Sequence, residues 1–189
     1  MNRQDTMAHV RLAVPDDASV IARIYVDTWR SIYAGSIPDK VLTRMSHARQ
    51  SSAWRHEIGV RSGRWVLVAE LPEDGIVGFV GLGANRFGPT SYDGEIQTLY
   101  VMDDFQGRGV GRTLLGAGFR HLEEKGFRTA VVWVLSANPA RFFYEAMGGR
   151  RIAERNECLW GTTLAETAYG WSDLAIGGRR RGADDPRPS

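Results

Sequence analysis

The sequence contains little cysteine and no long apolar run. Its single cysteine, Cys158, excludes an internal disulfide and a cysteine-based metal cluster. The 4 histidines are widely scattered, so we expect no metal. The longest uninterrupted apolar run covers only the 6 residues 130–135, whereas roughly 20 are needed to span a bilayer. Residues 1–9 are polar and lack the apolar core of a secretory signal. These absences favour a reduced, cytoplasmic protein without a membrane partner.

A charge excess of one sign is also missing from most of the chain. The 24 basic and 22 acidic residues give a net charge of +2, but the stretch 177–189 holds four arginines and two aspartates, which leaves 20 of each sign before it. A neutral body argues against a nucleic-acid partner, because such binding depends on neutralising phosphates. The stretch is rich in Arg, Pro and Gly, so we expect a disordered tail at 177–189 behind a single domain at 1–176.

The apolar periodicity and the turn residues predict a mixed order of strands and helices. Pro72, Asp74 and Gly75 lie between two apolar stretches and form a strong hairpin signal. Asp16 is placed to cap the first helix, and Gly126 to end the long one. This order predicts an α/β (α+β) fold of three layers, a mixed, mostly antiparallel sheet with helices on both faces. The predicted strands are 9–14, 65–70, 76–83, 95–101, 129–135, 151–157 and 163–174; helices are expected after Asp16, in short pieces between 39 and 58, over 109–125 and after Asn138.

Three alternate glycines follow the strand at 95–101 and open the long helix. Gly107, Gly109 and Gly111 let successive N–H groups converge without a Cβ in the way, and the helix N-terminus adds positive potential. This pattern favours a phosphate site with Arg108 and Arg112 at its rim; the alternative is a merely flexible connection. A dinucleotide fingerprint is excluded because position 112 is not glycine, and a Walker A loop because no lysine is nearby.

The segment Gln106-Gly-Arg-Gly-Val-Gly111 resembles the acyl-CoA pyrophosphate loop, Q/R-x-x-G-x-G/A, of the GNAT superfamily of N-acetyltransferases. The strand at 95–101 is similar to the fourth strand of that family, and residues 138–148 to the motif that follows it. In many members the asparagine of this motif precedes the tyrosine by seven residues, whereas Asn138 and Tyr144 are six apart. The strong matches cover about residues 93–149.

This resemblance implies an N-acetyltransferase that uses acetyl-CoA as cosubstrate, in a ternary complex with an amine. The pantetheine is expected to pair with backbone groups of β-strand residues, in a cleft where the strands at 95–101 and 129–135 separate. Asn138 is expected to cap a helix, and a hydrogen bond to the pantetheine is the open alternative. The residues predicted to bind the cosubstrate are Leu99, Tyr100, Val101, Gln106, Gly107, Arg108, Gly109, Val110, Gly111, Arg112 and Asn138.

Two residues are predicted to move protons. Glu95 stands inside an apolar strand, at the offset from Gln106 that the general base has in several family members. The alternative for Glu95 is a structural ion pair or exposure to solvent. Tyr144 is the candidate general acid for the leaving CoA thiolate, and its alternative is packing against Phe143 at the edge of a helix.

The acceptor side is less determined by the sequence. We expect a small primary amine or a peptide α-amine, with Trp29, Tyr33 and Tyr169 as candidates for the pocket wall. Trp29 and Tyr33, with Trp54, suit a helix core equally well. Carboxylates that could hold the amine, such as Asp27 and Glu166, are not ranked. Three questions stay open: another acyl-CoA as donor, a non-catalytic acyl-CoA-binding regulatory domain, and a homodimer, since dimers are common in the family.

Overall fold

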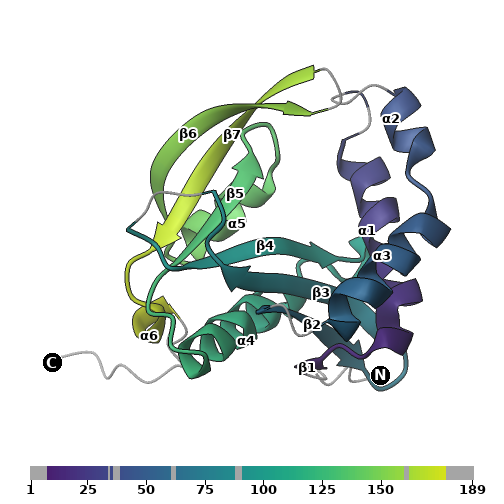
Figure 1. Ribbon diagram of the computed structural model, residues 1–189, viewed down its shortest axis with the longest axis horizontal. Coiled ribbons are helices and arrows are strands. Elements are labelled where there is room, and N and C mark those ends of the chain that lie inside the picture. Colours follow the sequence, from purple (N-terminus) through teal and green to yellow (C-terminus); the bar gives the residue numbers. More distant parts are fainter. Residues whose placement is uncertain are drawn as a thin grey trace, which may run out of the picture.

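The computed structural model describes residues 8–33, 35, 39–60, 63–87, 91–159 and 162–177. These residues form a seven-stranded sheet in the order β1-β2-β3-β4-β5-β7-β6 (Figure 1). The strands are β1 (His9–Leu12), β2 (Arg64–Leu71), β3 (Gly75–Ala84), β4 (Gly94–Val101), β5 (Ala130–Leu135), β6 (Arg150–Leu159) and β7 (Thr162–Trp171). The helices are α1 (Ala18–Ile32), α2 (Asp39–Arg44), α3 (His47–Gly59), α4 (Val110–Glu124), α5 (Ala140–Ala146) and α6 (Leu174–Gly177), with short 3-10 turns η1 (Pro15–Asp17) and η2 (Asp103–Phe105).

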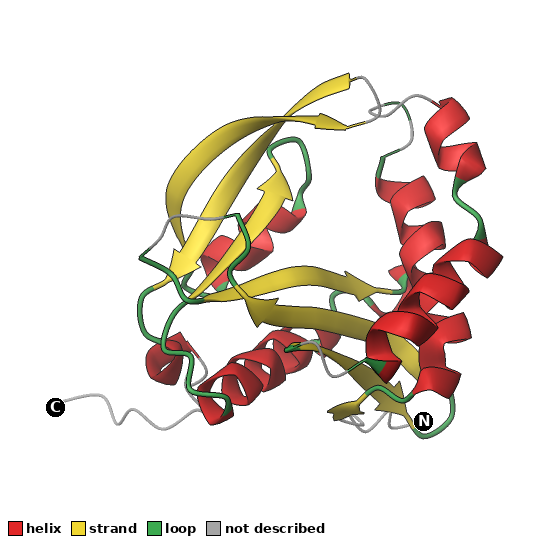
Figure 2. Cartoon of the chain, viewed as in Figure 1, coloured by secondary structure: helices red, strands yellow, loops and turns green. Residues whose placement is uncertain are grey.

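The predicted fold class is confirmed. All neighbouring strands of the sheet are antiparallel except β4 and β5, which α4 joins as a parallel crossover. Helices lie on both faces, as Figure 2 shows. On one face α1 and α3 bury Ile21, Ile24 and Trp54 against β2 and β3, and on the other face α4 buries Leu114 and Phe119 in the larger core. The resulting three layers leave the middle strands, β4 and β5, between the helices.

Several predicted boundaries differ at the ends of elements, and the strand predicted over 9–14 ends at Leu12. Asp16 is exposed, and it is Asp17 that precedes α1; its Oδ2 accepts the N–H of Val14 at 2.8 Å and pairs with Arg11 at 2.7 Å. The last strand ends at Trp171 rather than at 174, because Leu174 begins α6 and is fully buried. The turn η1 stands between β1 and α1, and α6 follows β7 closely, so the backbone changes direction earlier than the sequence predicts.

Three further expectations concern the C-terminal stretch, membrane-spanning helices and the single cysteine. Of the stretch 177–189, everything from 178 on lies outside the described residues, so the disordered tail stays a prediction. Within the described ranges, no helix is both long and apolar enough to cross a membrane. Cys158 lies on β6 as a free, exposed cysteine, a strand residue as expected.

Candidate active site

β4 and β5 are neighbours over only part of their length. Their parallel pairing joins residues 94–96 to residues 130–132 and stops there. Beyond Ile96, β5 turns away together with β7 and β6, while β4 continues along β3 to Val101 (Figure 1). The sheet is therefore open along the second half of β4, at the place where the sequence predicts that the two strands separate.

The open edge of β4 carries main-chain groups of two residues. The N–H of Met102 donates to the carbonyl of Val77 on β3 at 2.9 Å, which fixes the side toward which each residue turns. Because these groups alternate along a strand, those of Leu99 and Val101 face the opening, whereas those of Tyr100 face β3. The carbonyl of Val101 is already held by Nε2 of Gln106 at 3.1 Å. An extended ligand can therefore pair with Leu99 and with the N–H of Val101, while Tyr100 offers its side chain.

A cavity of about 830 Å³ lies along this open edge, between α1, β4, β5 and α5. Its volume is within the roughly 300–1,000 Å³ of small-molecule sites. The predicted site residues that line it are Trp29, Tyr33, Leu99, Tyr100, Val101, Gln106, Gly107, Gly109, Gly111, Arg112, Asn138 and Tyr144. Four predicted residues, Glu95, Arg108, Val110 and Tyr169, are not part of its lining.

The glycine loop places unpartnered N–H groups at the cavity. Gly107 and Gly109 have φ values of 72° and 83°, in the left-handed region that favours glycine, and Gly109 caps α4. The first hydrogen bond at this end of α4 runs from Thr113 to the carbonyl of Gly109, so the N–H groups of residues 110–112 have no partner within the helix. A Cβ at Gly111 would lie 3.6 Å from the ring of Phe143, where the cavity now has a bare backbone floor. This geometry suits an anion held by backbone N–H groups at a helix N-terminus.

The two arginines of the loop differ in position. Arg112 is exposed, lines the cavity and has no ion-pair partner in the described part of the chain. Arg108 instead stacks over the ring of Phe105 at 5.2 Å, and Val110 is buried in the core beneath the loop. Only Arg112 therefore has its guanidinium at the cavity, and Arg108 and Val110 contribute backbone alone.

Tyr144 is held in place by packing. Its side chain comes from α5, is only 5% exposed, and contacts the rings of Phe143 and Trp171. Its hydroxyl has no hydrogen-bond partner among the described residues, although the residue lines the cavity. Burial raises the pKa of Tyr144 above the ordinary value near 10, and nearby Tyr33 adds to the rise. The hydroxyl therefore keeps its proton over the physiological range and has it free to donate.

Asn138 and the aromatic side chains stiffen the opposite wall. Oδ1 of Asn138 accepts the N–H of Ala140 at 2.8 Å, which makes it the expected cap of α5, and its Nδ2 donates to the hydroxyl of Tyr33 at 2.9 Å. The indole N–H of Trp29 donates to the hydroxyl of Tyr100 at 2.8 Å. Because Asn138 is 7% exposed and bonded at both ends of its amide, a bond to a ligand would use its second Nδ2 proton or the second lone pair of Oδ1.

Glu95 is buried in an ion pair. Its carboxylate, 6% exposed, accepts the backbone N–H of Arg86 at 3.0 Å and the Nε and Nη2 groups of the same residue at 3.2 and 3.1 Å. Arg86 follows β3, whereas Glu95 is on β4, so the pair ties the chain after β3 to the neighbouring strand. This is the structural alternative that the sequence left open, and no described cavity is lined by Glu95 itself.

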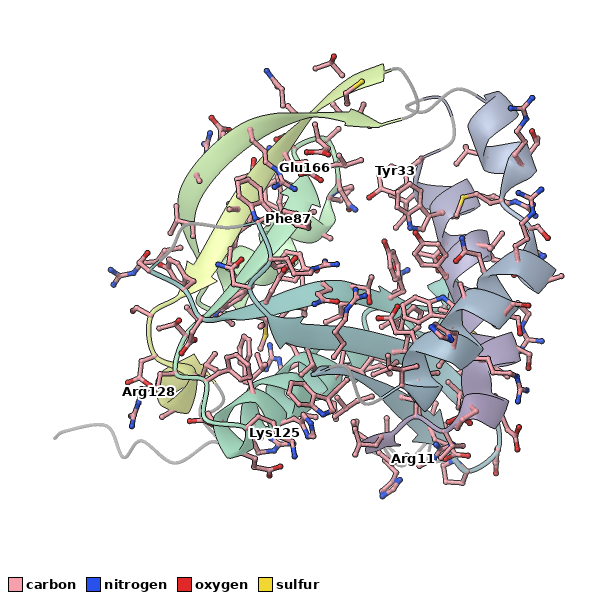
Figure 3. The ribbon with its side chains drawn as sticks, viewed as in Figure 1. Arg11, Tyr33, Phe87, Lys125, Arg128 and Glu166 are labelled. Atoms are coloured by element: carbon pink, nitrogen blue, oxygen red, sulfur yellow. The ribbon has the colours of Figure 1, made fainter. Side chains whose placement is uncertain are left out.

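Tyr169 faces away from the cavity. Its hydroxyl donates to Glu145 at 2.8 Å and its ring packs near that of Tyr144. Side chains alternate along β7, and Glu166, three positions earlier, is on the other face and lines the cavity. Glu166 from β7 and Tyr33 from the end of α1 lie on the two sides of the opening, as Figure 3 shows. Glu166, which the sequence could not rank, is thus a wall residue, and Tyr169 belongs to the core.

The comparisons with known proteins agree over most of the chain. The model of the acetyltransferase (GNAT) family matches residues 9–149. The uncharacterized N-acetyltransferase YuaI of Bacillus subtilis (strain 168) is 35% identical over 169 residues, which is 89% of this chain and 95% of that protein. The structure of a GCN5-related N-acetyltransferase from Rhodopseudomonas palustris is 25% identical, with a TM-score of 0.64 over 90% of this chain and 98% of that one. The protein yncA of Salmonella typhimurium, solved with acetyl-CoA, is 24% identical, with a TM-score of 0.64 over 94% and 98% of the two chains.

Proposed function

Because this chain belongs to the acetyltransferase (GNAT) family, we propose that it transfers the acetyl group of acetyl-CoA to a primary amine by direct attack in a ternary complex. The observation that carries this proposal is the open edge of β4 lying beside an unpartnered helix N-terminus, within one cavity. An extended thioester arm can pair with the open strand edge, and a pyrophosphate can bind at the helix N-terminus. The acetyl-CoA in the Salmonella structure supports the same donor.

The residues of the cavity fit two parts of acetyl-CoA, the pyrophosphate and the pantetheine. The N–H groups of residues 110–112 and the side chain of Arg112 offer positive potential to the pyrophosphate. Leu99 and Val101 offer backbone groups to the pantetheine, in the manner of an added strand. The bare backbone at Gly111 leaves room for the phosphates to approach closely.

The transfer forms a bond between the amine nitrogen and the acetyl carbon and breaks the bond from that carbon to sulfur. The sulfur leaves with the electron pair, and we assign the proton that it then takes to the hydroxyl of Tyr144, a residue of the cavity lining. The attacking amine must be neutral, although an ordinary alkylamine has a pKa of roughly 10.4, like lysine. No nucleophilic side chain is needed, since the amine itself attacks.

The proton of the amine leaves through water or through Glu95. The ion pair with Arg86 engages both carboxylate oxygens of Glu95, which supports a positioning role over a basic one. We therefore expect Glu95→Gln to lower kcat/KM by ~10-fold at every pH, the worth of one charge-assisted hydrogen bond. The measurement is the pH profile from 6 to 10, with Glu124→Gln on the exposed surface of α4 as control. A loss that is largest at low pH and recovers at high pH, where free amine is abundant, would instead make Glu95 the base.

The proposed function is tested by release of free CoA thiol. Acetyl-CoA is incubated with the enzyme and a series of amino acids, polyamines, aminoglycosides and peptides, and the N-acetyl product is confirmed by mass spectrometry. We expect thiol release that depends on the amine and equals the product formed. Propionyl-CoA and succinyl-CoA in the same assay decide whether another acyl group is preferred. Tight CoA binding without thiol release for any amine or donor would identify a non-catalytic acyl-CoA-binding domain instead.

A further inference from the structure

A second, smaller pocket adjoins the main cavity. It has a volume of about 220 Å³ and is bounded by α1, α3 and the strands β2, β3 and β4. It shares Tyr25, Gln97 and Thr98 with the main cavity, so the two spaces are direct neighbours. Its volume is below the roughly 300 Å³ of a complete small-molecule site, which suits one group of a substrate. We refer to it as the polar pocket.

A β-bulge in β4 brings Gln97 and Thr98 to this junction. Leu82 is paired with Ile96, and Gly81 with Thr98, so Gln97 is an extra residue in β4. Bulges re-aim side chains, and this one lies directly after the residue at which β4 and β5 separate. Gly81 lines the polar pocket opposite the bulge, and a Cβ there would lie 2.6 Å from Oγ1 of Thr98. Glycine at 81 thus keeps the bulge and its hydroxyl in place.

Two residues that line the polar pocket, Trp54 and Gln97, each carry a buried N–H donor without a partner in the described part of the chain. Trp54 is 8% exposed, and its Nε1 has no hydrogen-bond partner in the described part of the chain. The same holds for Nε2 of Gln97. The amide of Gln97 cannot turn to hide its donor, because Arg64 holds Oε1 through Nε at 2.9 Å and Nη2 at 2.6 Å. Buried donors without partners are destabilising, so an acceptor oxygen from a ligand would stabilise Nε1 of Trp54 and Nε2 of Gln97.

The two arginines of the polar pocket have more N–H donors than their partners Glu95 and Gln97 accept. Arg86 gives Nε and Nη2 to Glu95, which leaves its Nη1 protons, and Arg64 gives Nε and Nη2 to Gln97. The carboxylate that lines the pocket, Glu57, lies 3.4 Å from Nε of Arg64 and is paired with it. The described lining therefore presents guanidinium and N–H groups without a free anion, which is the chemistry that binds a carboxylate.

We propose that the polar pocket binds the carboxylate of the acceptor, so that the substrate is an amine that also carries a carboxyl group. The inference rests on the proposed function, because the amine of this molecule must reach the thioester in the main cavity. The carboxylate accepts from Trp54, Gln97 and Arg86, and the rest of the acceptor passes Tyr25 and Thr98 into the main cavity. Glu95 contributes by holding Arg86, which explains a buried carboxylate that lines neither space.

The acceptor series that tests this varies one group at a time. Glycine, β-alanine and γ-aminobutyrate are each compared with the matching carboxamide and with the alkylamine that lacks the carboxyl group. We expect the amino acid of the right length to exceed its carboxamide and its alkylamine by ~10–100-fold in kcat/KM, since hydrogen bonds to charged groups are the strong ones. Equal rates for acid and carboxamide would overturn the proposal in favour of a neutral carbonyl, as in a peptide.

Two variants connect this preference to the polar pocket. Trp54→Phe removes the indole N–H and keeps a ring against Phe79, and Gln97→Glu keeps the acceptor for Arg64 but replaces the free donor by a carboxylate oxygen. We expect the ratio of kcat/KM between amino acid and alkylamine to fall ~10-fold or more in each. His121→Phe is the control, because Nε2 of His121 is also buried and unpartnered in the described part of the chain, yet His121 lines neither space. Its ratio should stay at the wild-type value.

The outcomes separate this inference from the proposed function. If alkylamines are acetylated as well as amino acids and the ratio does not change in Trp54→Phe or Gln97→Glu, the carboxylate site is wrong while the acetyltransferase stands. If no amine of any class releases thiol while CoA binds, the proposed function itself fails. Acetyl-CoA affinity, measured by calorimetry on each variant, shows that the fold and the donor site remain intact.

Discussion

Gly111→Asp is expected to weaken acetyl-CoA binding by ~100-fold or more without unfolding the protein. Gly111 is the second residue of α4, where a negative side chain is favourable for the helix and where glycine has no positive φ to preserve. A Cβ at this position makes only ordinary contacts, 3.6 Å to Phe143 and 3.9 Å to Leu99. The added carboxylate, however, would stand where the pyrophosphate binds, and two charges 4 Å apart repel by about 4 kcal/mol at an effective dielectric constant of 20.

The controls for this variant separate charge from volume. Gly111→Asn adds nearly the same volume without the charge, and Gly111→Ala adds a single methyl group. Calorimetric Kd values for acetyl-CoA should rise in the order Ala, Asn, Asp, with the largest step between Asn and Asp, while the Tm of all three stays near that of the wild type. Equal Kd values for Asn and Asp would show that no phosphate lies at this helix N-terminus.

Gly109 is the less informative position for the same test. Its φ of 83° is strained for any residue with a Cβ, so a change there alters the turn before α4 as well as the charge. The cap position and the free N–H groups both depend on that turn. A loss of binding at Gly109 would therefore not distinguish repulsion from a distorted loop.

The segments that local chemistry determines are those that the sequence predicts well. The glycines at 107, 109 and 111, the apolar stripe of α4 and the cap at Asn138 are all readable within one or two turns of chain. The position where β4 and β5 separate follows from the same motif through its family resemblance. The bounds of the central strands accordingly differ from the prediction by at most one residue at either end.

The orientation and the partners of some residues depend on strand register or on distant loops, and local sequence patterns do not predict them. Alternation along β7 puts Tyr169 and Glu166 on opposite faces, and the pairing of Ala168 with Trp133 decides which of the two faces the cavity, since a shift of one residue would exchange them. The partner of Glu95 is Arg86, nine positions earlier in a loop with no periodic pattern. The bulge at Gln97 likewise leaves no mark in the alternation of β4, although it creates the junction between the two pockets.

The bulge and the separation of strands also explain why the site lies here. Pairing with β5 ends at Ile96, and Gln97 is the next residue and the extra one. The end of the pairing with β5 exposes backbone groups of Leu99 and Val101, and the bulge brings Gln97 and Thr98 to the junction of the two cavities. In the reaction that we propose, the donor and the acceptor therefore meet on neighbouring residues of one strand.

Tyr144→Phe is expected to slow the chemical step ~10–1000-fold, the scale of one lost proton donor, with little change in acetyl-CoA affinity. The leaving thiol has a pKa of roughly 8.5, so the thiolate can depart unaided and the variant should keep some activity. Because Tyr144 lines the cavity and its hydroxyl makes no hydrogen bond to a described residue, its removal should not lower the Tm. Single-turnover rates are the measurement, since slow product release would hide part of the effect. Tyr169→Phe, whose hydroxyl bonds Glu145 away from the cavity, is the matched control and should keep the wild-type rate.

The pH dependence of the wild type and of Tyr144→Phe is a second test of Tyr144 as the general acid. A general acid acts while it is protonated, and the raised pKa of Tyr144 means that its proton is lost only above the ordinary value near 10. The wild-type single-turnover rate should therefore rise with pH as the amine becomes neutral and show no descent below pH 10. The ratio of wild-type to Tyr144→Phe rates should be constant over the same range, because the acid is present throughout in one protein and absent in the other. A ratio of one at every pH would leave Tyr144 as a packing residue of α5, with water supplying the proton to the thiolate.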